Sequence, residues 1–126
     1  MIQVENNVIS DSCNAWRERL KDHREKLNEC QRHLQESAAK QLTRDQLQEV
    51  EQLHNQFHVQ LVNIHDLKHA IKTHLKKTGY EFDVKHGHLN DDTLAEHEEL
   101  LARYSGLEER LHELQARFNR YLGQFN

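Results

Sequence analysis

The stretch that decides the fold is residues 44–78, RDQLQEVEQLHNQFHVQLVNIHDLKHAIKTHLKKT. Its apolar residues return at alternating steps of three and four, the spacing that forms one stripe along a helix in a bundle. Thr43 and Gln46 fit a capping box at its start, and Gly79 after two lysines fits its end. The sequence therefore predicts a helix over about 44–78. Its expected stripe is Leu47, Val50, His54, Phe57, Leu61, Ile64, Ile71 and Leu75, with Lys68 as the one mismatch and Leu53 and Leu67 widening the face.

The same spacing continues on both sides of this stretch and predicts helices at about 11–39 and 91–124. The 126-residue chain contains no proline, so nothing forces such long helices to break. Residues 1–10 are expected to be a lead-in, and residues 80–90 a loop. The other two stripes are Cys13, Trp16, Leu20, His23, Leu27, Cys30 and Leu34, and then Leu94, His97, Leu101, Tyr104, Leu111, Phe118, Leu122 and Phe125.

These three segments predict an all-α fold: an elongated antiparallel three-helix bundle with coiled-coil-like heptad packing, in a single domain over residues 11–126. The short turn near residues 41–43 makes the first two helices antiparallel neighbours. The longer second loop allows the third helix to fold back on the second one. The stripes are also wide enough for the third helix to pair with a second copy of the chain, and the sequence leaves both arrangements open.

Composition and charge exclude several classes of function. The net charge is −4, and 17 basic and 21 acidic residues are interleaved along the chain. Without a basic block, nucleic acid and anionic membranes are not expected as partners. No signal peptide or membrane-spanning stretch is visible, which favours a cytoplasmic location. Cys13 and Cys30 lie too far apart on one helix for a disulfide, and are expected to be small core residues.

Histidine is the residue type in excess, with 11 in the chain. Mirroring the helices about their connections brings His23, His58 and His112 to one level of the bundle, with His54 one turn away. Imidazoles gathered in this way are typical ligands of zinc and other transition metals, so these four are the candidate metal ligands. A second pattern, His86 and His88 in the 80–90 loop, also fits a transition metal. The alternative is that most histidines are solvated or flank the core.

The leading functional hypothesis is a structural or interaction module that self-associates or docks a partner helix, because the stripes are broad and rich in leucine. The alternative is a histidine-rich bundle that binds a transition metal for storage or sensing. No catalytic constellation or resident cofactor is identifiable, so an enzyme is not expected. His23, His54 and His97 stand in the stripes, which predicts that mild acid loosens the bundle as buried neutral imidazoles take up protons.

Overall fold

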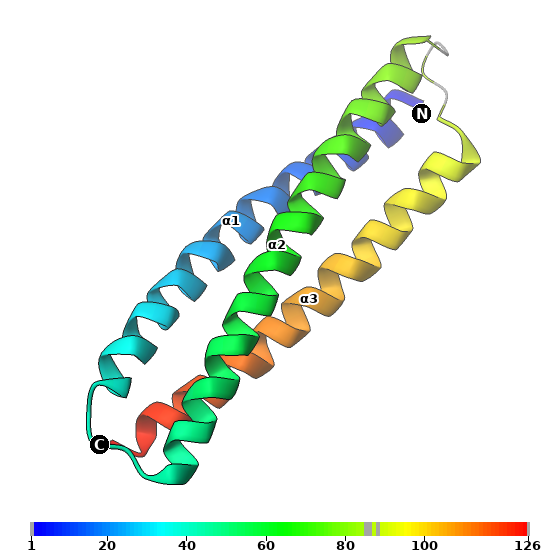
Figure 1. Cartoon of the computed structure of the whole chain (residues 1–126). Coiled ribbons are helices and arrows are strands. Elements are labelled where there is room, and N and C mark those ends of the chain that lie inside the picture. Colours follow the sequence, from blue (N-terminus) through cyan, green and yellow to red (C-terminus); the bar gives the residue numbers. More distant parts are fainter. Residues whose placement is uncertain (1, 85–86, 88, 126) are drawn as a thin grey trace.

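A computed structural model describes residues 2–84, 87 and 89–125, and it consists of three helices. They are α1 (Ile2–Ala38), α2 (Arg44–Val84) and α3 (Asp91–Gly123). They lie side by side in an elongated bundle, with α2 antiparallel to both α1 and α3 (Figure 1). The predicted all-α three-helix bundle is confirmed. In this structure α3 packs within its own chain, on α2.

Helices α1 and α3 run parallel and in register. Side chains paired between them differ in number by 84 or 85, as in Cys13 with His97 and Ser37 with Tyr121. A separation of 84 residues is twelve heptads of seven, so the two helices repeat the same stripe positions along their lengths. Equivalent positions therefore meet at every level of the bundle.

The buried stripe of α2 differs in part from the predicted one. Leu47 and His54 are exposed, although both belong to the predicted stripe. The difference arises because the buried stripe includes four polar residues. A stripe predicted from the apolar residues alone leaves these four out. The observed stripe is Leu53, Phe57, Gln60, Ile64, Leu67, Ile71, His74, Thr78 and Glu81.

Two helix boundaries also differ from the prediction. Helix α1 begins at Ile2, so the expected lead-in is helical, and buried Ile9 extends the stripe one step before Cys13. Helix α2 continues through Gly79 to Val84. The helix end expected at Gly79 does not occur there. The glycine with positive φ is Gly87, whose φ is 93° and whose N–H donates to the carbonyl of Phe82 at 2.7 Å. At the start of α2, Thr43 and Gln46 form the predicted capping box, with reciprocal bonds of 2.9 and 3.2 Å.

The core changes character along the bundle. Near the α1–α2 turn it is an "apolar end" built mainly from leucines and aromatic rings: Leu34, Leu53, Phe57, Leu114, Phe118 and Tyr121. Near the α2–α3 connection it is a "polar end", where side chains able to hydrogen-bond or ionise occupy the stripes: Cys13, His74, Thr78, Glu81, Thr93 and His97.

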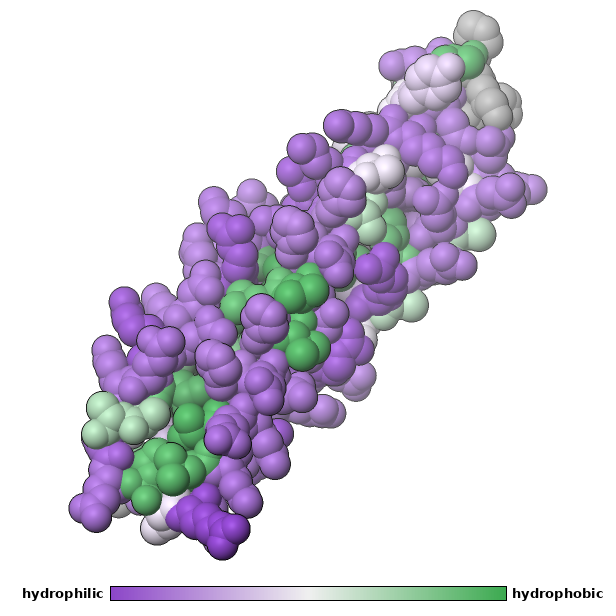
Figure 2. Space-filling view, viewed as in Figure 1, coloured by the Kyte–Doolittle hydropathy of each residue, from purple (hydrophilic) through white to green (hydrophobic). Residues whose placement is uncertain are grey.

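On the face that Figure 2 displays, hydrophilic residues dominate, and the hydrophobic residues show as separate clusters, the largest in the middle and toward the lower left. Within the described residues, the helices lack a stretch apolar and long enough to span a bilayer.

Candidate metal centre

Three potential metal ligands meet inside the polar end, one from each helix. They are Cys13 of α1, His74 of α2 and His97 of α3, and one ligand atom from each lies within 4.8 Å of the other two. Cys13 is fully buried and His74 is 1% exposed, whereas His97 is partly buried. Each occupies a heptad stripe position, so helix packing itself directs the three side chains toward one another.

The distances between the donor atoms fit a small coordination site. His97 Nδ1 lies 3.3 Å from His74 Nε2 and 4.0 Å from Cys13 Sγ. Tetrahedral zinc, with bonds of about 2.0–2.1 Å to nitrogen and about 2.3 Å to sulfur, holds two nitrogens about 3.3 Å apart and a nitrogen and a sulfur about 3.6 Å apart. The histidines therefore already have the required spacing, and the thiol has to approach by about 0.4 Å. Three protein ligands leave a fourth position for water or another group.

Burial sets the protonation of the three groups. It raises the pKa of the Cys13 thiol to about 11, against a smaller lowering effect of Arg17. It lowers the pKa of His74, with the neighbouring His97 as the next cause, and it lowers the pKa of His97 as well. At neutral pH both imidazoles are therefore neutral, and His97 Nδ1 and His74 Nε2 share one proton in a 3.3 Å hydrogen bond. A metal has to displace that proton, by moving it to another ring nitrogen, as well as the thiol proton.

A stack of rings fixes the orientation of His97. Its ring lies between Trp16 and His74, with centroid distances of 5.1 and 5.4 Å and an interplanar angle of 23° on both sides. Trp16 stacks in turn on Tyr104 at 5.6 Å. Trp16 is the only tryptophan of the chain, so its fluorescence reports directly on this site.

The polar groups around the site are unequally satisfied. Thr93 donates a 2.5 Å hydrogen bond to the buried carboxylate of Glu81, and the Thr78 hydroxyl donates to the carbonyl of Leu75. In contrast, His74 Nδ1 is buried without a hydrogen-bond partner among the described residues. Outer carboxylates or carbonyls often orient a metal-binding imidazole, whereas here the hydrogen bond and ring contact with His97, together with close packing, hold the His74 ring. The buried unpaired nitrogen lowers the stability of the polar end.

The four histidines named from the sequence lie elsewhere. His23 and His112 line one surface pocket between α1 and α3, and His23 Nε2 is 3.1 Å from Glu108 Oε2. His54 and His58 are exposed on α2, each one residue beyond a buried stripe position. None of the four belongs to the three-residue group, and metal binding by them stays a prediction. The alternative pair in the loop, His86 and His88, falls outside the described residues.

Sequence reasoning placed Cys13 and His97 in their stripes but missed His74. The missing signal was the phase of α2: from Leu67 and Ile71 the next step of three reaches His74, whereas the apolar pattern selected Leu75. Once the parallel register of α1 and α3 is known, the 84-residue offset pairs Cys13 with His97 directly.

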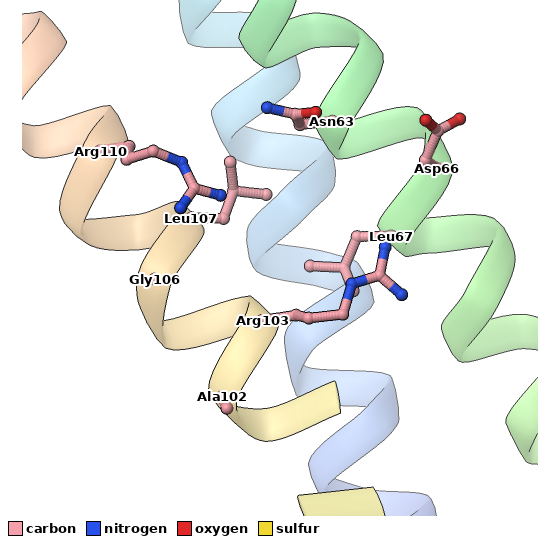
Figure 3. A pocket seen from close by; sticks show the side chains of 8 residues that line it. All are labelled: Asn63, Asp66, Leu67, Ala102, Arg103, Gly106, Leu107 and Arg110. Carbon is pink, nitrogen blue, oxygen red and sulfur yellow. The ribbon is translucent and has the colours of Figure 1, made fainter. Parts of the chain in front are cut away.

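A second feature is a surface groove between α2 and α3, opened by the missing side chain of Gly106. Arg103 reaches from α3 toward α2 across it, whereas the Arg110 guanidinium lies beside Gly106 of its own helix (Figure 3). Within the described part of the chain neither arginine forms an ion pair, but both are exposed. Charges in such an open groove act through water and bind weakly. The Cys13–His74–His97 group is therefore the better candidate site.

The chain matches no protein-family model, and searches of the curated proteins and the solved structures return no match. Its function is therefore inferred from its own geometry.

Proposed function

We propose that this protein binds one transition-metal ion through Cys13, His74 and His97. The observation that carries the proposal is the convergence of one thiol and two imidazoles, from three different helices, within 4.8 Å. A thiolate with two imidazoles suits zinc or copper, whereas magnesium and calcium require oxygen ligands. Zinc is the ion that the tetrahedral spacing supports best.

The energetics of the polar end also support a ligand role. Leucines in the positions of His74 and Thr78 would bury apolar surface without desolvating polar groups. A metal that binds only the folded chain offsets this cost, contributing about 2.7 kcal/mol when its free concentration is one hundred times Kd. Metal binding therefore accounts for the polar residues at this end, because its binding free energy compensates for the stability that they cost.

Metal titration with a matched pair of cysteine variants tests the proposal. Untagged protein is loaded with Zn²⁺ for elemental analysis and with Co²⁺ for absorption, where a thiolate ligand gives a charge-transfer band. One metal per chain and this band are expected in the wild type and in Cys30→Ser, but not in Cys13→Ser. Cys30 is the proper control, because it is also buried on α1 but donates to Gln115 instead of facing two histidines. Equal binding by both variants, or no binding by the wild type, would refute the proposal.

Self-association, predicted from the sequence, is a second candidate function. Four large apolar residues are more than half exposed, and three of them lie near the polar end: Val8 at 55%, Tyr80 at 69% and Val84 at 54%. Exposed apolar side chains gathered at one end favour contact between two copies of the chain. Sedimentation velocity is expected to show a dimer that Tyr80→Lys dissociates. A wild-type monomer at the highest soluble concentration would exclude this role.

A further inference from the structure

We propose that the metal acts as a clasp: it ties α1 to the hairpin of α2 and α3, so that the polar end closes when metal binds and loosens when metal leaves. This inference rests on the proposed metal-binding function and adds a sensing role to it. The clasp changes how readily α1 opens at the polar end, and this opening is measurable separately from metal binding.

The chain topology makes α1 the element that a metal would capture. His74 and His97 belong to consecutive helices, and the α2–α3 connection lies at the same end of the bundle as the site (Figure 1). Helix α1 is joined to α2 only at the opposite end, through residues 39–43. At the polar end α1 is therefore held by side-chain contacts alone, and a bond from Cys13 to a shared metal would add a second tether.

The buried α2 side chains at this end are polar, and the leucines beside them, Leu75, Leu89 and Leu94, are only partly buried. Helix α1 contributes Ile9, Cys13 and Trp16 to the core. Beyond Ile71, the buried residues of α2 are His74, Thr78 and Glu81, all of them polar. The hydrophobic contribution scales with the apolar area removed from water, so α1 is held less tightly here than at the apolar end. Regions with few buried apolar contacts open locally at low free-energy cost.

The donor distances leave the Cys13 thiol of α1 as the ligand furthest from metal-binding geometry. The two histidine nitrogens, 3.3 Å apart, already have the spacing of metal ligands. The Cys13 sulfur, 4.0 Å from His97 Nδ1, is the donor that has to move inward. Because Cys13 lies on a continuous helix, its approach draws the neighbouring turns of α1 toward the hairpin. The two histidines of the α2–α3 hairpin are thus already in place for a metal, and Cys13 of α1 completes the site.

Hydrogen–deuterium exchange of the full chain, with and without Zn²⁺, tests the clasp. Amide exchange is expected to slow about tenfold in peptides from residues 2–16 and 74–84 when Zn²⁺ binds. Peptides from residues 27–38 and 107–121, at the apolar end, are expected to change little. The effect should persist in Cys30→Ser and vanish in Cys13→Ser, in which one sulfur atom is replaced by oxygen.

Trp16 provides a second measurement at the site itself. Its ring stacks on His97, so closure of α1 should shield it from solvent. Acrylamide quenching of Trp16 fluorescence is expected to fall when Zn²⁺ is added to the wild type and to Cys30→Ser, with no change in Cys13→Ser.

The outcomes separate this inference from the proposed function. If Zn²⁺ binds but leaves exchange in residues 2–16 unchanged, the clasp is wrong while metal binding stands. If exchange slows equally at both ends, the metal stabilises the whole bundle and a local clasp is again excluded. If the wild type binds no metal, both proposals fall.

Discussion

The two ends of this bundle share one geometry and differ in what fills it. At the apolar end, Phe57 and Phe118 pack edge to face at a centroid distance of 5.3 Å. The Tyr121 hydroxyl donates to the Ser37 hydroxyl at 2.9 Å, and Ser37 donates to the carbonyl of Leu34 at 2.8 Å. At the polar end, the same heptad positions hold a thiol and two imidazoles, and His74 Nδ1 has no hydrogen-bond partner among the described residues. Heptad position thus determines burial, whereas the identity of the side chain determines whether burial stabilises the fold or forms a site.

The largest effect is expected from Phe118→Ala, which breaks the apolar end. Phe118 is 2% exposed and contacts Phe57, Tyr121 and the edge of His33. Losing the ring should cost about 3–5 kcal/mol in the free energy of unfolding, because the rigid surroundings leave a cavity. Urea denaturation followed by circular dichroism measures it, with the half-exposed Val59→Ala as control. A loss below about 1 kcal/mol would show that this end is loosely packed.

The sequence predicted the fold well because heptad spacing records which side of a helix is buried. All three helices and the buried stripe of α1, except His23, follow from it, and the capping box follows from Thr43 and Gln46 themselves. It could not give the ends of the helices as reliably. Gly79 has the signature of a helix end, but the polar stripe continues through Thr78 and Glu81 and extends α2 to Val84.

The site was harder to predict because the sequence does not distinguish a buried histidine from an exposed one. His54 and His74 both lie next to apolar residues of α2, and only packing shows that the first is exposed and the second is buried. The three ligands are also far apart in sequence, and their meeting depends on the relative register of three helices. In parts of α2 the predicted stripe was one residue out of phase, so it took His54 for the buried Leu53 and Leu75 for the buried His74.

The next largest effect is expected from His74→Leu, which makes the polar end resemble the apolar one. In the metal-free protein this change should raise the free energy of unfolding by about 1 kcal/mol. It removes a buried nitrogen without a partner, which costs about 1–3 kcal/mol, and loses the hydrogen bond to His97, which contributes about 0.5–1.5 kcal/mol. It should also abolish metal binding. The measurement is urea unfolding in the presence of a chelator, with exposed His54→Leu as the matched control. A less stable His74→Leu protein would mean that the contact between His74 and His97 stabilises the fold on balance.

A smaller effect is expected from pH in the metal-free protein. Burial lowers the pKa of His74 and His97 below the usual 6.5, so stability is fully present above about pH 6.5 and is lost as pH falls through their folded-state values. The effect is limited because His97 is only partly buried and its charge is partly hydrated. The charged groups that act on the two rings are Glu96, Lys77 and Glu81 for His74, and Glu98 for His97.

Thermal melts with a chelator, between about pH 7.5 and about pH 5.5, measure this dependence. The melting temperature of the wild type is expected to fall, and that of His74→Leu to fall less. An equal decrease in both proteins would assign the pH dependence to groups outside the polar end.

The smallest effect distinguishes two glycines that border the polar end. Gly79 lies inside α2 with no neighbour within 4 Å of an added Cβ, so Gly79→Ala should stabilise the protein by about 0.5–1 kcal/mol through helix propensity. Gly87 has a φ of 93°, so Gly87→Ala should destabilise it by about 1 kcal/mol. Melting temperatures of the two variants should therefore shift in opposite directions. If Gly79→Ala is the destabilising one, then α2 ends at Gly79, and the buried bond between Glu81 and Thr93 could not form as described, because its carboxylate would no longer lie on a helical stripe.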